Sequence, residues 1–242
     1  MFPPTGRDIM NLWLSSHFLV VGLFVCSAAP TPEECSQLVS PLSEDIGSKM
    51  LGSWNVLACY TQGELFHHIL KITESSRVKI TNSSDGGVEY SEHSKMKGQC
   101  FSSVAHMKIH GDTTTVSMLN ITSVLHVLSS SDDFLVFNVN STIGNLDQIL
   151  NFMNISISGV EGTTVHSVYL MGRETRVEDS DLERFKRQAS CLGFSREPDF
   201  LHDLKNGASP CSLAHYTLTS PAHVTLLSAD FCTEGESVKL MF

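Results

Sequence analysis

Histidine, cysteine and carboxylate side chains are numerous enough in this chain to ask whether they support catalysis or metal binding. The chain carries 11 histidines, 7 cysteines and 26 acidic residues. It has no G-x-S-x-G nucleophile turn, no H-E-x-x-H zinc helix and no glycine-rich phosphate loop. His67 and His68 form the most suggestive pair, but adjacent side chains in the strand expected there point to opposite faces and could hardly share a metal. The sequence therefore predicts a protein that is not an enzyme and holds no metal or cofactor.

The first thirty residues have the order of a secretory signal peptide. Arg7 precedes an apolar run from Leu12 to Cys26, and the small residues Ser27, Ala28 and Ala29 follow. The unbroken part of the run is much shorter than the roughly 20 residues needed to span a bilayer, which favours a signal peptide over a membrane anchor. Cleavage is expected near residue 28. We therefore expect the mature protein to be secreted and extracellular.

Cleavage would leave an even set of cysteines, which disulfides explain most simply in an oxidising compartment. The six are Cys35, Cys59, Cys100, Cys191, Cys211 and Cys232. Four N-x-S/T sequences are acceptors for N-linked glycans and would have to face solvent. Their asparagines are Asn82, Asn120, Asn140 and Asn154. The sequence thus predicts a disulfide-bonded glycoprotein.

The charge balance argues against a nucleic-acid partner. Lys and Arg total 16 against 26 Asp and Glu, a formal net charge of −10, whereas phosphate backbones are bound by clustered cations. With 41% apolar and 17% charged residues in a chain of 242, the composition is typical of a folded globular protein.

Short segments rich in β-branched and aromatic residues alternate with Ser, Asn, Asp and Gly clusters between residues 51 and 170. Eight to ten strands at this spacing predict an antiparallel sandwich or barrel. The expected strands are Trp54–Tyr60, Phe66–Ile72, Val78–Thr81, Val88–Glu92, Cys100–Ile109, Thr114–Ile121, Val124–Leu128, Phe134–Val139, Met153–Ile157 and Thr164–Leu170.

One helix is expected after these strands. Ser180 and Glu183 have the spacing of a capping box, and Gly193 is a plausible stop signal. Between them, the apolar residues recur at three- and four-residue steps and form one stripe. The stripe consists of Leu182, Phe185, Ala189 and Leu192. It predicts packing against the sheet rather than a membrane-surface helix, because the helix is short and the protein acidic; no stable membrane insertion is expected.

Three local features resemble the lipocalin family. Gly52-Ser-Trp54 is similar to the G-x-W signature at the first lipocalin strand, and the segment Val165–Tyr169 with Arg173 is similar to the last strand before the lipocalin helix. The stretch from Cys191 to Cys211 resembles the short closing segment after that helix. The resemblance is strongest to the orosomucoid (alpha-1-acid glycoprotein) group with the pufferfish saxitoxin- and tetrodotoxin-binding proteins, and weaker to apolipoprotein M. The middle signature, T-D-Y, is not evident.

The resemblance implies an all-β fold: an eight-stranded antiparallel up-and-down lipocalin barrel with one C-terminal α-helix packed outside. It divides the chain into a signal peptide at 1–28, a lipocalin domain at 29–211 and an atypical tail at 212–242. Gly52, Trp54 and Arg173 would close one end of the barrel. The tail could add a strand to the domain or extend from it.

The resemblance also implies two disulfides, Cys35–Cys191 and Cys100–Cys211. The remaining cysteines depart from the family pattern, and two arrangements stay open. Cys59 could pair with Cys232 and attach the tail, or Cys59 could be a free buried thiol.

A barrel of this kind has room for one small ligand. If Trp54 points inward, strand alternation places Val56, Ala58 and Tyr60 on the same inner face. Val165, Ser167 and Tyr169 share one face by the same argument, and a slip of one residue would turn Glu92 outward. The residues that the resemblance and the parity place at the ligand are Val56, Glu92, Met118, Phe137, Ser167 and Tyr169.

The expected function is a secreted, glycosylated carrier. Apolar burial would bind a small lipophilic or amphipathic molecule in the barrel, and an inward carboxylate would suit a cationic one. Transport or sequestration would follow from reversible binding. The alternative is an extracellular interaction or immunomodulatory module, whose loops and glycans contact a plasma protein or receptor.

Overall fold

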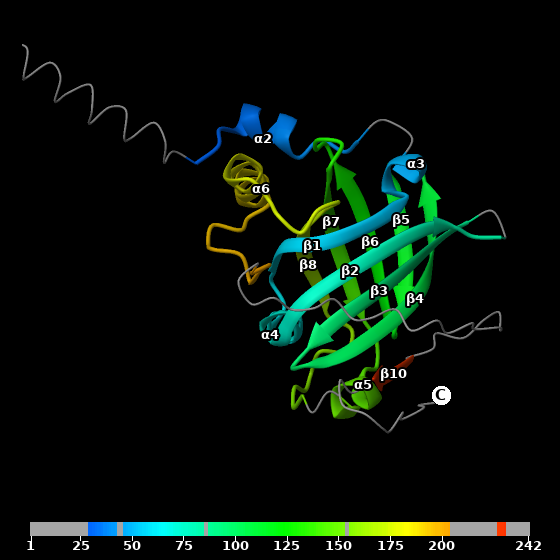
Figure 1. Cartoon of the computed structure of the whole chain (residues 1–242). Coiled ribbons are helices and arrows are strands. Elements are labelled where there is room, and N and C mark those ends of the chain that lie inside the picture. The colour runs from blue at the N-terminus through cyan, green and yellow to red at the C-terminus, as the bar shows by residue number, and fades with distance from the viewer. Residues whose placement is uncertain (1–28, 43–45, 85–86, 153–154, 204–226, 231–242) are drawn as a thin grey trace, which may run out of the picture.

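A computed structural model describes residues 29–42, 46–84, 87–152, 155–203 and 227–230. Eight strands form a barrel, and the helices lie at its two ends and along one side (Figure 1). The barrel strands are β1 (Gly52–Thr61), β2 (Thr73–Asn82), β3 (Val88–Met96), β4 (Gln99–His110), β5 (Thr113–Met118), β6 (Ile121–Leu128), β7 (Phe134–Ile143) and β8 (Thr164–Gly172). The helices are α2 (Pro32–Leu38), α3 (Ile46–Met50), α4 (Glu64–Ile72), α5 (Asp147–Phe152) and α6 (Asp179–Cys191).

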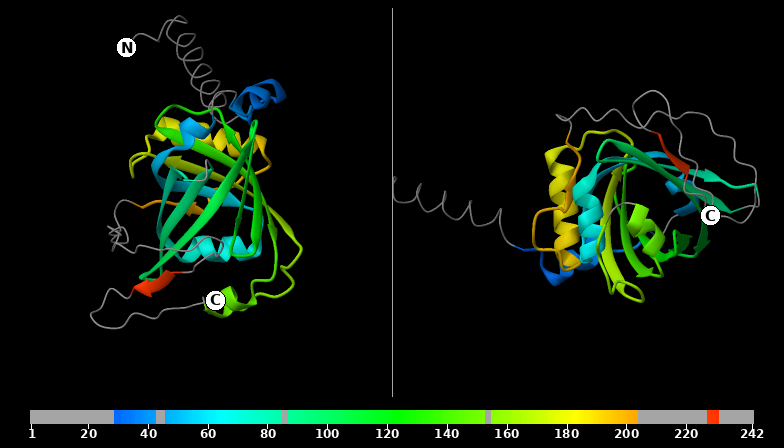
Figure 2. Two further views of the ribbon diagram at one scale, coloured as in Figure 1. Left: turned by 90° about the vertical axis from the view of Figure 1, so that its right-hand side faces the viewer. Right: turned by 90° about the horizontal axis from the view of Figure 1, so that it is seen from below.

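The sheet closes on itself. Each barrel strand pairs antiparallel with the next one along the chain, including β4 with β5. The pairing of β8 with β1 then completes the ring. Two short strands join from outside the ring: β9 (Phe200–Leu201) pairs with β1, and β10 (Leu227–Asp230) pairs with β4. The predicted fold is confirmed as an eight-stranded antiparallel closed barrel with a helix packed outside (Figure 2).

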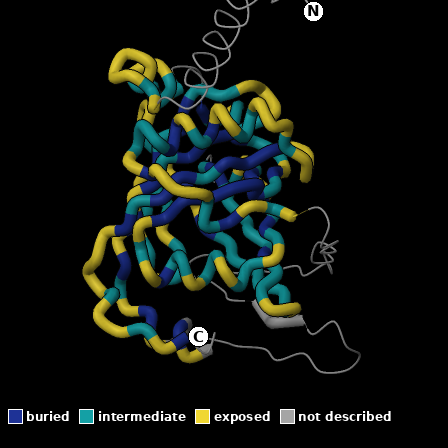
Figure 3. The backbone as a smooth tube through the Cα atoms, turned by 90° about the vertical axis from the view of Figure 1, so that its left-hand side faces the viewer, coloured by how far each residue is buried: buried dark blue, intermediate teal, exposed yellow. Residues whose placement is uncertain are grey.

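Buried residues run along many of the barrel strands (Figure 3), and they form clusters on both sides of the barrel wall. One apolar cluster lies inside the barrel, and a second lies between the wall and α6. Phe185 and Ala189 are buried in the second cluster, and Leu182 and Leu192 pack against it. The apolar stripe predicted for this helix therefore packs on the sheet, as expected.

Two predicted strands are wrong. Residues 66–72 belong to α4, where Leu65 and Ile69 recur at a helical step of four and face one apolar cluster. Residues 155–157 have no regular structure, and residues 153–154 lie outside the described residues. Both predictions relied on β-branched and aromatic content, which is a weak guide where tertiary packing decides the conformation.

The predicted capping box at Ser180 is also wrong. Helix α6 begins at Asp179 with Glu178 as its N-cap, and no side chain caps it. A reciprocal capping box occurs instead at α2, where Thr31 and Glu34 each accept from the other's backbone N–H. The predicted stop at Gly193 agrees with its φ of 93°, a value that favours glycine.

The Cys35–Cys191 disulfide is present and joins α2 to the end of α6. Cys100 is also disulfide-bonded, and its predicted partner Cys211 lies outside the described residues. Cys59 is a buried free thiol, so of the two arrangements left open the structure has the second. Cys232 lies outside the described residues.

The predictions for the two ends of the chain are covered only in part. The signal peptide at 1–28 lies outside the described residues, and within the tail β10 adds a strand to β4. Asn82, Asn120 and Asn140 are exposed, while Asn154 lies outside the described residues. Among the described helices, none is long and apolar enough to cross a membrane.

Candidate functional site

The end of the barrel next to α3 is packed around Trp54. The Trp54 indole N–H donates to the Met50 carbonyl at 2.8 Å, and the Arg173 guanidinium lies 3.5 Å from the ring centroid. Gly52 has a φ of 113°, and a Cβ at this position would collide with the Arg173 guanidinium, so the position favours glycine. Gly52, Trp54 and Arg173 thus meet at one end of the barrel.

Above this end the barrel interior is apolar. Cross-strand neighbours share a face, so the register of the strands identifies the inward side chains. The buried inward residues of this layer include Val56, Val78, Ile80, Val88, Met107, Leu125, Val127, Leu135, Phe137, Val139 and Met171. Burial of these side chains contributes to the stability of the barrel and makes the interior next to the α3 end mainly apolar. We call this part of the interior the floor.

Glu92 lies on the inward face of β3, half-buried between the two ends of the barrel. It pairs across the strands with Val78, which is fully buried in the interior cluster. Its carboxylate accepts hydrogen bonds from Ser76 and Ser94 at 2.8 Å and from Tyr90 at 3.0 Å. Within the described residues no Lys, Arg or His forms an ion pair with it. This carboxylate is therefore satisfied by hydroxyl groups alone.

Hydroxyl groups continue around the wall from Glu92. Ser123 and Ser141 lie 2.8 Å apart across β6 and β7, and Ser167 on β8 donates to Thr61 on β1 at 2.8 Å. All are at inward register positions. The interior thus has an apolar floor followed by a polar belt.

Two tyrosines and the free thiol lie near the belt carboxylate. Burial, together with the charge and hydrogen bonding of Glu92, raises the pKa of Tyr90 well above its usual value. Burial and the neighbouring Cys59 and Glu92 do the same for the pKa of Tyr169. Burial also raises the pKa of the Cys59 thiol. These three groups therefore stay neutral at physiological pH.

Helix α4 lies at the other end of the barrel, together with the segment between β7 and β8, which contains α5 (Figure 2). They share an apolar cluster that includes Leu65 of α4 and Ile155 of the β7–β8 segment. Leu70, on the same helix, packs against the interior cluster. Helix α4 therefore packs both on the β7–β8 segment and on the barrel interior.

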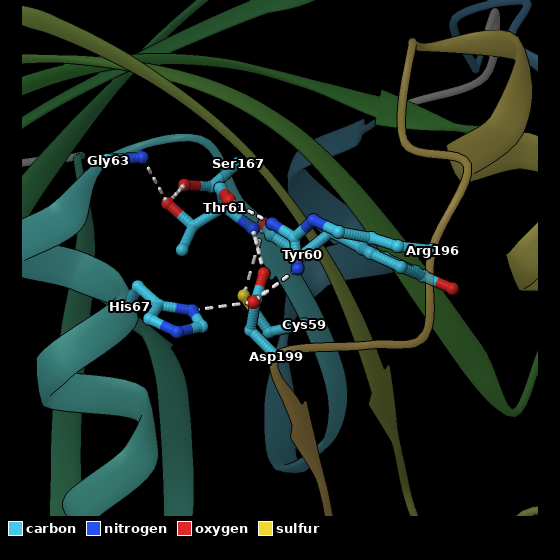
Figure 4. A network of polar contacts seen from close by, with 8 residues as sticks. All are labelled: Cys59, Tyr60, Thr61, Gly63, His67, Ser167, Arg196 and Asp199. Carbon is cyan, nitrogen blue, oxygen red and sulfur yellow. Dashed lines mark hydrogen bonds and ion pairs between the residues drawn. The ribbon is translucent and has the colours of Figure 1, made fainter.

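Asp199 attaches α4 to the chain that follows α6 (Figure 4). Its side chain is only 1% exposed, and it accepts the Thr61 backbone N–H at 2.8 Å. His67 Nδ1 lies 2.7 Å from its second oxygen, and Arg196 pairs with the same oxygen. Burial alone would raise the pKa of Asp199, but the hydrogen bonds from Arg196, Thr61 and His67 outweigh it and lower that pKa.

We expect Asp199→Asn to lower the free energy of unfolding by about 2–3 kcal/mol at neutral pH, because charge-assisted hydrogen bonds are lost. A lowered folded-state pKa means that this stabilisation is complete above the unfolded pKa of about 4 and is lost as pH falls through the folded value. Urea unfolding of both proteins over a pH series checks this. A difference that stays constant down to about pH 2 would contradict the charge-based explanation.

Two clefts open at this end of the barrel. One, of about 300 Å³, lies between α4 and residues 155–157, and the other, of about 420 Å³, lies at the β5–β6 turn. His67 and His68 both line the first cleft, and Met118 lines the second. The expectation that His67 and His68 alternate across a strand is wrong, because both lie on a helix. Among the described residues no cluster of three potential metal ligands occurs.

The predicted ligand residues occupy different levels of the barrel. Val56 and Phe137 are buried in the interior cluster, whereas Glu92 and Ser167 belong to the polar belt. Tyr169 packs against the interior cluster close to the belt, and Met118 lies at the rim. The structure therefore places five of the six predicted residues in the barrel interior, and the sixth, Met118, at the end of the barrel next to α4.

The predicted inward positions of Ala58 and Tyr60 are wrong. The β1–β8 register shifts between Val56 and Ala58, and this irregularity reverses the alternation. Ala58 and Tyr60 consequently pack in the cluster beneath α6, while Cys59 faces the interior.

Several polar residues of the site were not predicted from the sequence. Tyr90 and Ser94 follow from Glu92 by alternation along one strand and could have been found that way. Asp199 and Arg196 lie far along the chain from the residues they contact, and no local signal indicates those contacts.

Comparison with known proteins gives no match to any family model and no match among curated proteins. Solved structures do match. Ex-FABP, a siderocalin described as functioning through dual ligand specificities, is 14% identical with a TM-score of 0.49, covering 64% of this chain and 95% of its own. Odorant binding protein OBP1 is 13% identical with a TM-score of 0.44, covering 62% and 86%.

Lipocalin 12 from rat epididymis superposes with a TM-score of 0.52 at 12% identity, covering 68% of this chain and 89% of that protein. The chain has the lipocalin fold. In this lipocalin fold, Trp54 and Arg173 lie at the α3 end of the barrel, and the belt around Glu92 lies between that end and α4. At such low identity the likeness concerns the fold alone.

Proposed function

We propose that this protein is a secreted, glycosylated carrier that binds a small lipophilic or amphipathic molecule, preferably a cation, inside its barrel without transforming it. The observation that carries the proposal is the inward carboxylate of Glu92, which three hydroxyl groups satisfy and with which no described cation forms an ion pair. The exposure of Asn82, Asn120 and Asn140 is compatible with glycans.

The cost of removing water from the Glu92 carboxylate favours a cationic ligand. A partly buried carboxylate that loses hydration is costly unless charge or hydrogen bonds compensate it. Neutral hydroxyls compensate part of that cost, and a ligand ammonium group would add a charge-assisted hydrogen bond. The apolar floor below the belt would bury the hydrophobic part of the same molecule. An amphipathic amine therefore matches the two layers of the interior.

The proposed contacts follow this layering. Val56 and Phe137 would contact the apolar body of the ligand, and Glu92 its cation. Ser167 and Tyr169 of β8 would orient the ligand, and Met118 would contact it at the end of the barrel next to α4. The fold, in which β7 and β8 bring Phe137 opposite Tyr169, supports this grouping.

We expect Glu92→Gln to weaken binding of dodecylamine by roughly 10- to 100-fold, because the ion pair is lost while the hydroxyl partners can still be satisfied. Binding of neutral dodecanol should change by less than about threefold. Isothermal titration calorimetry on the full chain measures both. The tested feature is the charge, since Gln keeps the size of Glu.

Glu89→Gln is the matched control. Glu89 lies on the same strand but at an outward position, so its replacement should leave both affinities unchanged. Equal loss of amine and alcohol binding in Glu92→Gln would refute the cation preference. No saturable binding of either probe by the native protein would refute the carrier function itself.

A further inference from the structure

Thr114 places a hydroxyl group in the apolar part of the barrel. It is the second residue of β5, and its cross-strand partners are Ile109 on β4 and Leu125 on β6. Leu125 is buried in the interior cluster and Ile109 packs against it. Because directly opposite residues share a face, Thr114 points into the barrel.

This hydroxyl has no hydrogen-bond partner among the described residues. Thr114 is only 1% exposed, and its Oγ1 is buried without a donor or acceptor. The other inward hydroxyls described above each have a partner; they belong to Thr61, Ser76, Tyr90, Ser94, Ser123, Ser141 and Ser167. An unpaired hydroxyl in apolar surroundings destabilises the empty protein, and such groups in native structures call for an explanation.

Thr114 and Glu92 lie at different depths. Strand β1 begins at the α3 end and the strands alternate in direction, so β5 also begins there. Thr114 is therefore close to the α3 end of the barrel. Glu92 is the central residue of β3, four positions from each end of that strand. The interior between them is apolar.

We propose that Thr114 determines ligand specificity at the α3 end of the barrel. Its hydroxyl group would form a hydrogen bond with one oxygen atom of the ligand, at the end of the ligand that lies farthest from its cationic group. The inference rests on the proposed function and narrows it. The ligand class is an amphiphile with an ammonium group at one end, an apolar body and a hydroxyl or carbonyl oxygen at the other. Thr114 can donate to or accept from that oxygen.

The test compares dodecylamine with its omega-hydroxylated analogue, together with shorter and longer homologues of both. Calorimetry on the native protein should show that the hydroxylated amines of the best-fitting length bind more tightly than the plain amines. Thr114→Val keeps the shape and removes the hydroxyl, and it should abolish this preference, weakening the hydroxylated amine roughly tenfold without changing the plain amine. Thr114→Ser should retain the preference.

Thr115→Val is the matched control, because Thr115 is the next residue on β5 and faces outward. A second readout needs no ligand: Thr114→Val should raise the Tm of the empty protein by about 2–4 °C, since an unpaired hydroxyl is removed. If both amines bind native protein and Thr114→Val alike, without any preference, the inference is wrong and the carrier function stands. If neither amine binds native protein, the proposed function fails and the inference with it.

Discussion

Replacing Cys35 and Cys191 together by serine is expected to lower the free energy of unfolding by about 4–5 kcal/mol and the Tm by about 10–20 °C. The disulfide joins residues 156 positions apart, so its removal releases a long loop in the unfolded chain. Urea and thermal unfolding of the double variant, with ligand absent, measure the effect.

The same contact also contains noncovalent interactions, which provide the control. The Arg187 guanidinium donates to the Glu34 carboxylate at 3.0 Å, and both side chains are about half exposed at 49%. Arg187→Ala should therefore cost less than about 1 kcal/mol. A double-serine variant that loses no more than Arg187→Ala would show that the disulfide does not stabilise the fold.

Trp54→Ala is expected to cost about 3–5 kcal/mol. The ring is 1% exposed, belongs to the interior cluster and is covered by Arg173, so truncation leaves a large cavity at the α3 end. It also leaves the Met50 carbonyl without its indole donor. The unfolding free energy from urea titration is the measurement.

Trp54→Phe separates packing from hydrogen bonding. It keeps an aromatic ring beneath Arg173 and loses the N–H donor, so about 1–2 kcal/mol should be lost. Equal costs for the two variants would mean that the indole hydrogen bond, rather than the packed ring, stabilises this end.

Much of the barrel could be predicted because its signals are local. Alternating apolar residues and turn clusters indicated all eight barrel strands, although the strand expected to end at Ile121 runs past the end of β5 at Met118 into the first residue of β6. The stripe from Leu182 to Leu192 indicated how α6 packs, since a 3.6-residue period defines a helix face. The Cys35–Cys191 pairing came from resemblance rather than from spacing, which does not determine connectivity.

The remaining features depend on contacts between distant segments. The shift after Val56 exchanges the faces of Ala58 and Cys59, and nothing in the local alternation of β1 announces it. Helix α4 has the aromatic and β-branched content of a strand, but packing on the β7–β8 segment and Asp199 hold it as a helix. In the site, Glu92 could be placed by resemblance, whereas the unpaired state of Thr114 is a property of the assembled barrel.

The attachment of α4 to Asp199 has a consequence for biosynthesis. Thr61 and His67 emerge from the ribosome well over a hundred residues before Asp199 reaches them. The barrel strands can pair as they are synthesised, but α4 gains its contact with Asp199 only when the chain has been made as far as residue 199. In a nascent chain arrested before Asp199, the barrel should therefore have α4 not yet held in place by its contact with that carboxylate.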